Sequence, residues 1–107
     1  MIYELRTYHC LAGRLPALLE RFETLTCRLF EAHGIKQVGF WTLDDEANSD
    51  LVYMLKWDSV ADREAAWASF RVDPEWVAAR AKEGNAGAMV ASITTQLLMP
   101  TAFSALR

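Results

Sequence analysis

The stretch Ile2-Tyr3-Glu4-Leu5-Arg6-Thr7-Tyr8 decides the fold, because it predicts a β-strand that begins almost at the first residue. Alternate side chains of a strand lie on opposite faces, and one face here carries a polar row formed by Glu4, Arg6 and Tyr8. The other face carries Tyr3, Leu5 and Thr7. A half-buried strand normally has one apolar face and one wet face. We therefore expect the second set to pack against helices and the polar row to lie on the other side of the sheet.

A helix is predicted after this strand, because leucine and phenylalanine recur at helical spacing from Leu15 to Phe30. Pro16 suits a first helical turn. His33-Gly34 ends the helix with a residue that can carry a positive charge, followed by glycine. β-Branched and aromatic residues then predict a strand over 36–43, in which Gly39 indicates a bulge or a close backbone approach.

The second half of the chain repeats the pattern. A polar turn over 44–50, which includes Asp44-Asp45-Glu46, leads into a strand over 51–57. Ser59 is predicted to cap a second helix, and Asp73-Pro74 restarts helical structure with an N-cap followed by proline. Gly84 and Gly87 flank a link to the last strand, which is predicted over 93–99.

The order of elements is therefore βαββαβ, the ferredoxin-like arrangement of an α+β protein. It predicts a single domain over residues 1–107, in which both helices cover one face of one antiparallel sheet. The second face would be bare and would carry aromatic side chains such as Trp41 or Tyr53. We expect two subunits to place these faces together as a homodimer, which would form a dimeric α+β barrel with a central cavity.

Composition and charge exclude several classes of protein. The formal net charge is −3 and Lys and Arg are scattered, which argues against a nucleic-acid partner. The apolar runs are too short for a transmembrane segment. The hydrophobic fraction is 52%, which is high for 107 residues and favours a partner surface. Cys10 and Cys27 are expected to be reduced thiols of a cytoplasmic protein, because a strand rather than a signal peptide begins the chain.

Motifs for metals, nucleotides and nucleophiles are missing from the sequence. Neither His9 nor His33 lies in a metal-ligand spacing, so no metal is expected. His33 is interpreted as helix-end capping and His9 as a weak candidate for a general base. There is no glycine-rich phosphate loop, no Gly-x-Ser-x-Gly and no Cys-x-x-Cys, and no cofactor is predicted.

Several stretches, taken in order, resemble the NIPSNAP family. They are Ile2–Tyr8 with Gly13, His33-Gly34, Val38–Thr42, Val52–Ser59 with Arg63, and Asp73–Trp76. The resemblance extends from Ile2 to about Pro100. It implies a dimeric α+β barrel, the fold shared with small antibiotic-biosynthesis-type monooxygenases, and it implies no particular reaction.

Five residues are candidates for lining a ligand cavity, and no pattern identifies a catalytic group. The candidates are Arg6, Tyr8, Trp41, Tyr53 and Trp57. In this hypothesis Arg6 binds an anionic ligand, Tyr8 donates or accepts a proton, and Glu4 holds Arg6 in place. The aromatic residues would form a pocket for a flat organic ligand. The alternatives are a strand face whose charges satisfy one another, and a dimer-interface core that contains Trp41, Tyr53, Leu55 and Trp57.

The sequence therefore leaves two functions open. The first is a homodimer with a small cavity for an organic ligand, which could act as a monooxygenase-like or isomerase-like enzyme without a cofactor. The second is a non-enzymatic interaction or scaffold module, whose polar strand face sets the register of the dimer. A cavity at Arg6 or Tyr53 would favour the first function. A fully packed interior in which Arg6 is paired would favour the second.

Overall fold

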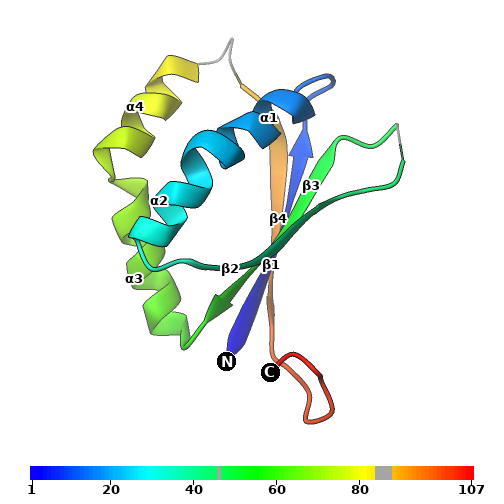
Figure 1. The fold of residues 1–107 in the computed structure, drawn as a ribbon, viewed down its shortest axis with the longest axis vertical. Helices are drawn as coiled ribbons and strands as arrows, with labels where there is room; N and C mark the ends of the chain where they lie inside the picture. The colour runs from blue at the N-terminus through cyan, green and yellow to red at the C-terminus, as the bar shows by residue number, and fades with distance from the viewer. Residues whose placement is uncertain (46, 84–87) are drawn as a thin grey trace.

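The computed structural model describes residues 1–45, 47–83 and 88–107, and it confirms the α+β class and the predicted order of elements. A four-stranded sheet forms one layer and the helices form the other (Figure 1). Each predicted helical region is divided into shorter segments. The elements are β1 (Ile2–Cys10), α1 (Leu15–Arg21), η1 (Phe22–Thr26), α2 (Cys27–Ala32), β2 (Lys36–Thr42), β3 (Asp50–Trp57), α3 (Val60–Arg71), α4 (Pro74–Glu83) and β4 (Val90–Leu98).

The strands follow the order β2-β3-β1-β4, and every neighbouring pair is antiparallel. β1 is therefore central, and Arg6 pairs with Tyr53 of β3 on one side and with Thr95 of β4 on the other. β2 and β4 are the two edges. Nearly every residue of β4 is exposed, so the helices cover the other strands better than they cover β4.

Two predicted helix caps are confirmed. Ser59 Oγ accepts a hydrogen bond from the Asp62 N–H at 3.1 Å at the start of α3. Asp73 Oδ1 accepts one from the Glu75 N–H at 2.8 Å at the start of α4. Such an oxygen satisfies a backbone N–H that has no partner within the helix. The caps fix where α3 and α4 begin, and so which of their side chains face the sheet.

The irregularity predicted at Gly39 is a bulge in β2. Gln37 pairs with Leu55 of β3, whereas Gly39 pairs with Met54, so Val38 is the extra residue. The register after the bulge decides which aromatic side chains of β2 lie against the helices.

The helix predicted from Leu15 to Phe30 contains a widened turn. Residues Phe22–Thr26 (η1) are π-helical, and the N–H of the following residue bonds to the carbonyl five residues earlier. A π-turn holds one more residue than an α-turn, so it changes the angular position of everything after it. Leu18 before the turn and Leu29 after it are both buried. The widened turn therefore keeps both halves of the helical segment on the core.

The core between sheet and helices is largely aromatic. Tyr53, Leu55 and Trp57 are all buried, which confirms that they share a face of β3. The ring centroid of Phe30 lies 6.1 Å from that of Tyr53, and the centroid of Trp67 lies 6.4 Å from that of Trp57. Helices of the same chain cover these residues, so the alternative that placed them in a dimer interface is wrong.

The predicted assignment of the two faces of β1 is also wrong. Glu4 is 0% exposed and Tyr8 is 9% exposed, and both lie on the face that the helices cover. Arg63 and Trp67 of α3 bond to Glu4, so the polar row has partners in the core that the strand pattern does not reveal. Burial of this row is favourable only because those partners are present.

The second face of the sheet, which we call the open face, therefore carries the residues that were expected against the helices. Its members on three strands are Tyr3, Leu5 and Thr7 of β1, Val52, Met54 and Lys56 of β3, and Trp41 of β2. Trp41 is 51% exposed there. Tyr53, which was also expected on this face, lies in the core instead, together with Phe40, its partner in β2.

Two predicted segments fall partly or wholly outside the described residues. Glu46 of the acidic turn and the Gly84–Gly87 link are not among them. In the described part of the turn, Asp45 Oδ1 accepts a hydrogen bond from the Ala47 N–H at 3.0 Å. None of the described helices combines the length and the apolar character that crossing a membrane requires.

Candidate functional site

One buried carboxylate organises the helix-facing side of β1. Glu4 Oε1 accepts hydrogen bonds from Trp57 Nε1 at 2.9 Å, Trp67 Nε1 at 3.1 Å and Arg63 Nε at 2.8 Å. Glu4 Oε2 accepts from Arg63 Nη2 at 3.2 Å and from Arg6 Nη1 at 3.0 Å. We call these five residues the Glu4 cluster. A carboxylate offers about four lone-pair positions, so these bonds use its full capacity and leave Glu4 unable to act as a base.

The electrostatics of the Glu4 cluster follow from these bonds. Burial alone would raise the pKa of Glu4, but the hydrogen bonds from Arg63, Trp67 and Arg6 outweigh it, so its pKa is lowered. Glu4 is therefore ionised at neutral pH, and its single negative charge faces two guanidinium groups. Its role is to hold Arg6 and Arg63 in fixed positions.

Arg6 connects the Glu4 cluster to two tyrosine hydroxyls. Its Nε donates to Tyr53 OH at 2.7 Å, and its Nη2 donates to Tyr8 OH at 3.4 Å. Its guanidinium carbon lies 4.6 Å from the ring centroid of Trp67, within cation–π range. Burial would lower the pKa of Arg6, but Tyr53, Tyr8 and Glu4 raise it, so Arg6 stays charged.

The two hydroxyls form a relay that ends at Tyr8. Tyr53 OH accepts from Arg6 and donates to Tyr8 OH at 3.0 Å. Burial raises the pKa of Tyr53, and the neighbouring Tyr8 adds to this effect, so Tyr53 stays protonated and acts as a donor. The Tyr8 hydroxyl thus accepts two hydrogen bonds, and no acceptor for its own proton lies in the described part of the chain. Donors of this kind in a chain of hydrogen bonds are polarised by the bonds behind them.

Tyr8 also forms part of the wall of a cleft of about 310 Å³ between β4 and the helices α1 and α4. Its lining residues are Tyr8, Arg21, Trp76, Arg80, Val90, Ala91, Ser92 and Ile93. Two of them carry positive charge and two are aromatic. The cleft can therefore offer a hydroxyl donor, guanidinium groups and flat apolar walls to one small molecule.

The structure brings four of the five predicted cavity residues together. Arg6, Tyr8 and Tyr53 are directly hydrogen-bonded, and Trp57 joins them through Glu4. Of these, Tyr8 is the one that lines the cleft. Trp41 lies apart from them on the open face.

Five residues of the cluster and cleft were not predicted from the sequence. They are Arg21, Arg63, Trp67, Trp76 and Arg80. One signal existed for two of them, because Arg63 and Trp67 are four residues apart and so lie on the same side of α3. The same spacing relates Trp76 and Arg80 on α4. Spacing shows that two side chains are neighbours, but it does not show which strand they face.

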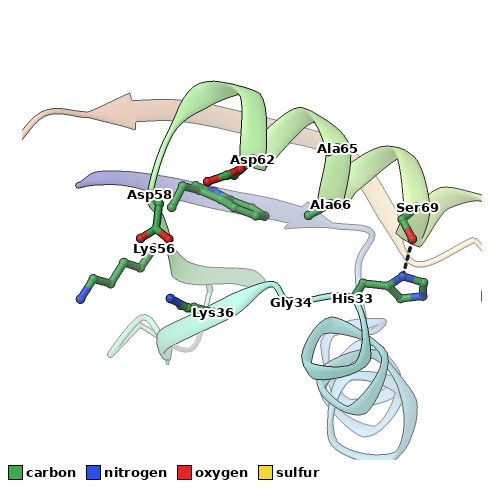
Figure 2. Close-up of a pocket in the computed structure, with 10 residues that line it drawn as sticks. His33, Gly34, Lys36, Lys56, Asp58, Asp62, Ala65, Ala66 and Ser69 are labelled. Atoms are coloured by element: carbon green, nitrogen blue, oxygen red, sulfur yellow. Dashed lines mark hydrogen bonds between the residues drawn. The ribbon is translucent and has the colours of Figure 1, made fainter.

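A second cleft, of about 380 Å³, lies between the end of α2, helix α3 and the strands β2 and β3 (Figure 2). His33 Nδ1 lies 2.7 Å from Ser69 Oγ, and His33 Nε2 lies 2.6 Å from Asp73 Oδ2. The hydrogen bond from His33 is the main cause of the lowered pKa of Asp73. The charged residues of this lining are two lysines and two aspartates, and His33 lies among them.

These three residue types occur in hydrolase triads, but the setting of Ser69 does not support one. Ser69 lies near the end of α3, where the backbone N–H groups are already bonded within the helix. No oxyanion hole can therefore form from the backbone beside Ser69. His33 is the C-cap residue of α2, and its ring connects that helix end to the junction of α3 and α4. We therefore interpret His33 as a structural residue that links α2 to the junction of α3 and α4.

The remaining candidates also have structural roles. His9 lies 3.1 Å from Asp50 through Nδ1 and 3.0 Å from Thr94 through Nε2, so both ring nitrogens are engaged. Cys10 and Cys27 are unpaired, and burial raises the pKa of each thiol, which makes both poor nucleophiles. The described residues contain no group of three or more His, Cys, Asp or Glu side chains placed to hold a metal ion.

Comparison with known proteins gives a family and a fold. A family model described as NIPSNAP matches residues 3–105. An uncharacterized NIPSNAP domain protein from Burkholderia xenovorans is 24% identical, with a TM-score of 0.83, over 97% of this chain and 98% of that one. A protein from Agrobacterium tumefaciens is 25% identical over 100% of both chains, with a TM-score of 0.87. No curated protein matches the chain.

A more distant structure shares the fold alone. It is a protein from Nitrosomonas europaea provisionally assigned as an antibiotic biosynthesis monooxygenase, and it is 11% identical, with a TM-score of 0.64, over 94% of this chain and 98% of that one. Similarity at this level shows a common arrangement of sheet and helices and says nothing of a shared reaction.

Proposed function

The chain belongs to the NIPSNAP family, and we propose that it forms a homodimer in which each subunit binds a small organic ligand in the cleft beside Tyr8. One observation carries the ligand proposal. Tyr8 is buried, its hydroxyl accepts hydrogen bonds from Tyr53 and Arg6, and its own proton has no acceptor within the described residues. Buried donors are normally satisfied, so an oxygen atom of a ligand in the cleft is the natural acceptor.

The chemistry that this donor would supply is polarisation of the ligand oxygen. The Arg6 charge acts on Tyr53 and then on Tyr8, so the Tyr8 O–H would strengthen as a donor when negative charge develops on the acceptor. Polarisation of a carbonyl oxygen acidifies the C–H group of the neighbouring carbon. Isomerase-like or monooxygenase-like chemistry without a cofactor would also need a base to take that proton, and we assign none, so the proposal itself is for binding.

Two features support the homodimer. The open face carries half-exposed apolar side chains, among them Leu5, Met54 and Trp41. The edge strand β4, Val90–Leu98, contains no charged residue and no proline, the residue types that normally block pairing of an exposed edge. Light scattering during size-exclusion chromatography tests this and should give twice the chain mass of 12.1 kDa.

The alternative function, a non-enzymatic interaction module, is favoured by the Glu4 cluster. Glu4 and Arg6 satisfy each other and their neighbours, as a purely structural ion set would. The cleft at Tyr8 lies beside that cluster and is not filled by it. The two functions therefore differ in whether the Tyr8 hydroxyl meets a ligand.

Titration calorimetry with a library of small aromatic carbonyl compounds, including benzoate, benzamide and acetophenone, tests the ligand proposal. At least one compound should bind the wild type, and Tyr8→Phe should weaken it by roughly tenfold, because one hydrogen bond is lost. Tyr3→Phe is the matched control, since it removes a buried hydroxyl outside the cleft, and it should bind as the wild type does. Binding by none of the compounds, or equal binding by Tyr8→Phe, would favour the interaction module.

Cytoplasmic location is part of the same proposal. Both cysteines are unpaired and partly buried, as is usual for proteins of a reducing compartment.

A further inference from the structure

We infer that the ligand of the cleft is a compact aromatic carboxylate, whose carboxylate group is held by Arg21 and Arg80 and by the Tyr8 hydroxyl. This inference rests on the proposed ligand-binding function and names the chemical class of the ligand. It starts from the charges at the cleft, which are separate from the Glu4 cluster.

Arg21 is the more deeply buried of the two arginines at the cleft. It lies in the last turn of α1, and its side chain is 11% exposed. Its Nη1 pairs with Glu83 Oε1 at the end of α4. Its Nε is buried and has no hydrogen-bond partner in the described part of the chain. An unsatisfied buried N–H of a cation is costly, and an anion in the cleft would remove that cost.

The charges around the cleft do not balance within the described residues. Arg21 and Arg80 both line the cleft, and none of the described acidic residues does. In this part of the chain, the carboxylate that pairs with them is that of Glu83, which bonds to Arg21 and lies 3.8 Å from Arg80 Nε. Two positive charges thus share one negative charge, and the surplus positive charge faces the cleft. A ligand with one negative charge would balance it.

The walls of the cleft favour an aromatic acid over a bare inorganic anion. Trp76 lies beside both guanidinium groups, with its ring centroid 5.2 Å from the guanidinium carbon of Arg21 and 5.8 Å from that of Arg80. Such contacts hold each guanidinium group against an apolar surface. Ile93 and Tyr8 add further apolar area to the lining. A planar carboxylate can accept paired N–H bonds from a guanidinium group while its ring contacts these walls.

Matched pairs of probes test this inference by calorimetry at one ionic strength. The pairs are benzoate with benzamide and 2-naphthoate with 2-naphthamide, because each amide keeps the shape of the acid and removes its charge. Inorganic phosphate is the probe for a bare anion. We expect each acid to bind the wild type at least tenfold more tightly than its amide, and more tightly than phosphate.

Variants identify the residues responsible. Arg80→Gln should reduce the preference for acid over amide to less than half its wild-type value, with little effect on folding because Arg80 is largely exposed. Arg28→Gln is the matched control, since Arg28 is an exposed arginine that pairs with Glu75 away from the cleft, and it should keep the full preference. Arg21→Lys retains the charge and removes the buried Nε, and it should weaken the acids more than the amides.

Three outcomes of these measurements would contradict the inference in different ways. Equal binding of acid and amide would overturn the carboxylate inference and leave the proposed ligand-binding function intact. Equal binding of phosphate and the acids would overturn the aromatic class. An acid preference that survives both Arg80→Gln and Arg21→Lys would place the anion elsewhere and overturn the assignment to this cleft.

Discussion

The two faces of β1 differ in a way that opposes the usual rule for strands. The helix-facing side buries a carboxylate, a guanidinium group and a phenol, namely Glu4, Arg6 and Tyr8. The open face carries apolar side chains such as Leu5, which the chain itself leaves half exposed. The polarity of a strand face therefore does not decide by itself whether that face is buried. It also depends on whether other elements supply hydrogen-bond and ion-pair partners.

Each face therefore lacks a different kind of partner. The helix-facing side is satisfied electrostatically except at its ends, where the Tyr8 proton and Arg21 Nε have no acceptor in the described chain. The open face is largely uncovered by the described chain, although Tyr3 on it is buried. A small ligand could supply the acceptors that are missing at the helix-facing side. A large apolar surface, such as that of a second copy, could cover the open face. Four predictions test this contrast.

The largest effect is expected from Glu4→Gln. The change keeps the size of the fully buried side chain but leaves Arg6 and Arg63, which are partly buried, without a counter-charge. Removing one partner of a buried ion set costs about 3–5 kcal/mol, and we expect a loss toward the lower end of that range. Urea unfolding monitored by circular dichroism measures the loss. Glu20→Gln on the exposed side of α1 is the control and should be neutral. A loss for Glu4→Gln no larger than that of the control would show that the Glu4 cluster does not stabilise the fold.

Leu5→Lys tests the open face at the neighbouring position of the same strand. A lysine can extend to water in a monomer, but in a dimer interface it would be buried, so the dimer Kd should rise on the order of 100-fold, about 2.7 kcal/mol. Analytical ultracentrifugation measures the change. Leu19→Lys, at an exposed leucine of α1, should leave the dimer intact. A dimer that tolerates Leu5→Lys would mean that the subunits do not meet through this face.

Acid should weaken the helix-facing side selectively. The folded pKa of Glu4 is lowered from its usual value of 4.5, so between the two values the unfolded chain binds more protons. The stabilisation by Glu4 is therefore fully present above the unfolded value and is lost as pH falls through the folded value. Asp73, whose pKa is also lowered, acts in the same direction.

The unfolding free energy of the wild type should therefore fall below pH 4.5 more steeply than that of Glu4→Gln. The effect is smaller than that of the substitution itself, because the lowered pKa lets Glu4 keep its charge through part of the acid range, whereas Glu4→Gln removes the charge at every pH. Parallel slopes for the two proteins would show that Glu4 does not titrate abnormally.

The smallest effect is expected from Gly39→Ala on the open face. The added Cβ would lie 2.8 Å from the ring of Trp41, which is half exposed and can move. A shifted rotamer costs about 1 kcal/mol. Thermal unfolding should show a small loss, and tryptophan emission should change because Trp41 moves. Unchanged emission would mean that the Trp41 ring does not lie over Gly39.

The sequence predicted well those features whose causes lie within a few residues. Ser59 and Asp73 cap helices because each oxygen bonds to a backbone N–H two or three residues ahead. The bulge beside Gly39 and the order of the elements are local in the same sense.

The orientation of β1 was not predictable in this way, because its causes are remote. The partners of Glu4 on Oε1 lie 53, 59 and 63 residues further along the chain. Seen alone, an alternation of Glu, Arg and Tyr is typical of a wet face. Trp41 lies on the open face as expected, whereas Tyr53 does not, since it pairs with Phe40 and is buried in the core. The cleft residues Arg21 and Arg80 come from different helices, and only the packing of α1 against α4 brings them together.

The π-turn at Phe22–Thr26 has a consequence for how this gene can vary in length. A deletion of one codon inside the turn would turn it into ordinary α-helix, and because the widened turn holds one extra residue, the residues after it would keep their orientation. Leu29 and Phe30, which are both buried, would then stay in the core, whereas a deletion in the α-helical part between them and the turn would rotate them by about 100°. We therefore expect this segment, which also exposes Glu23 and Thr24, to tolerate the loss of one residue better than the α-helical residues on either side of it.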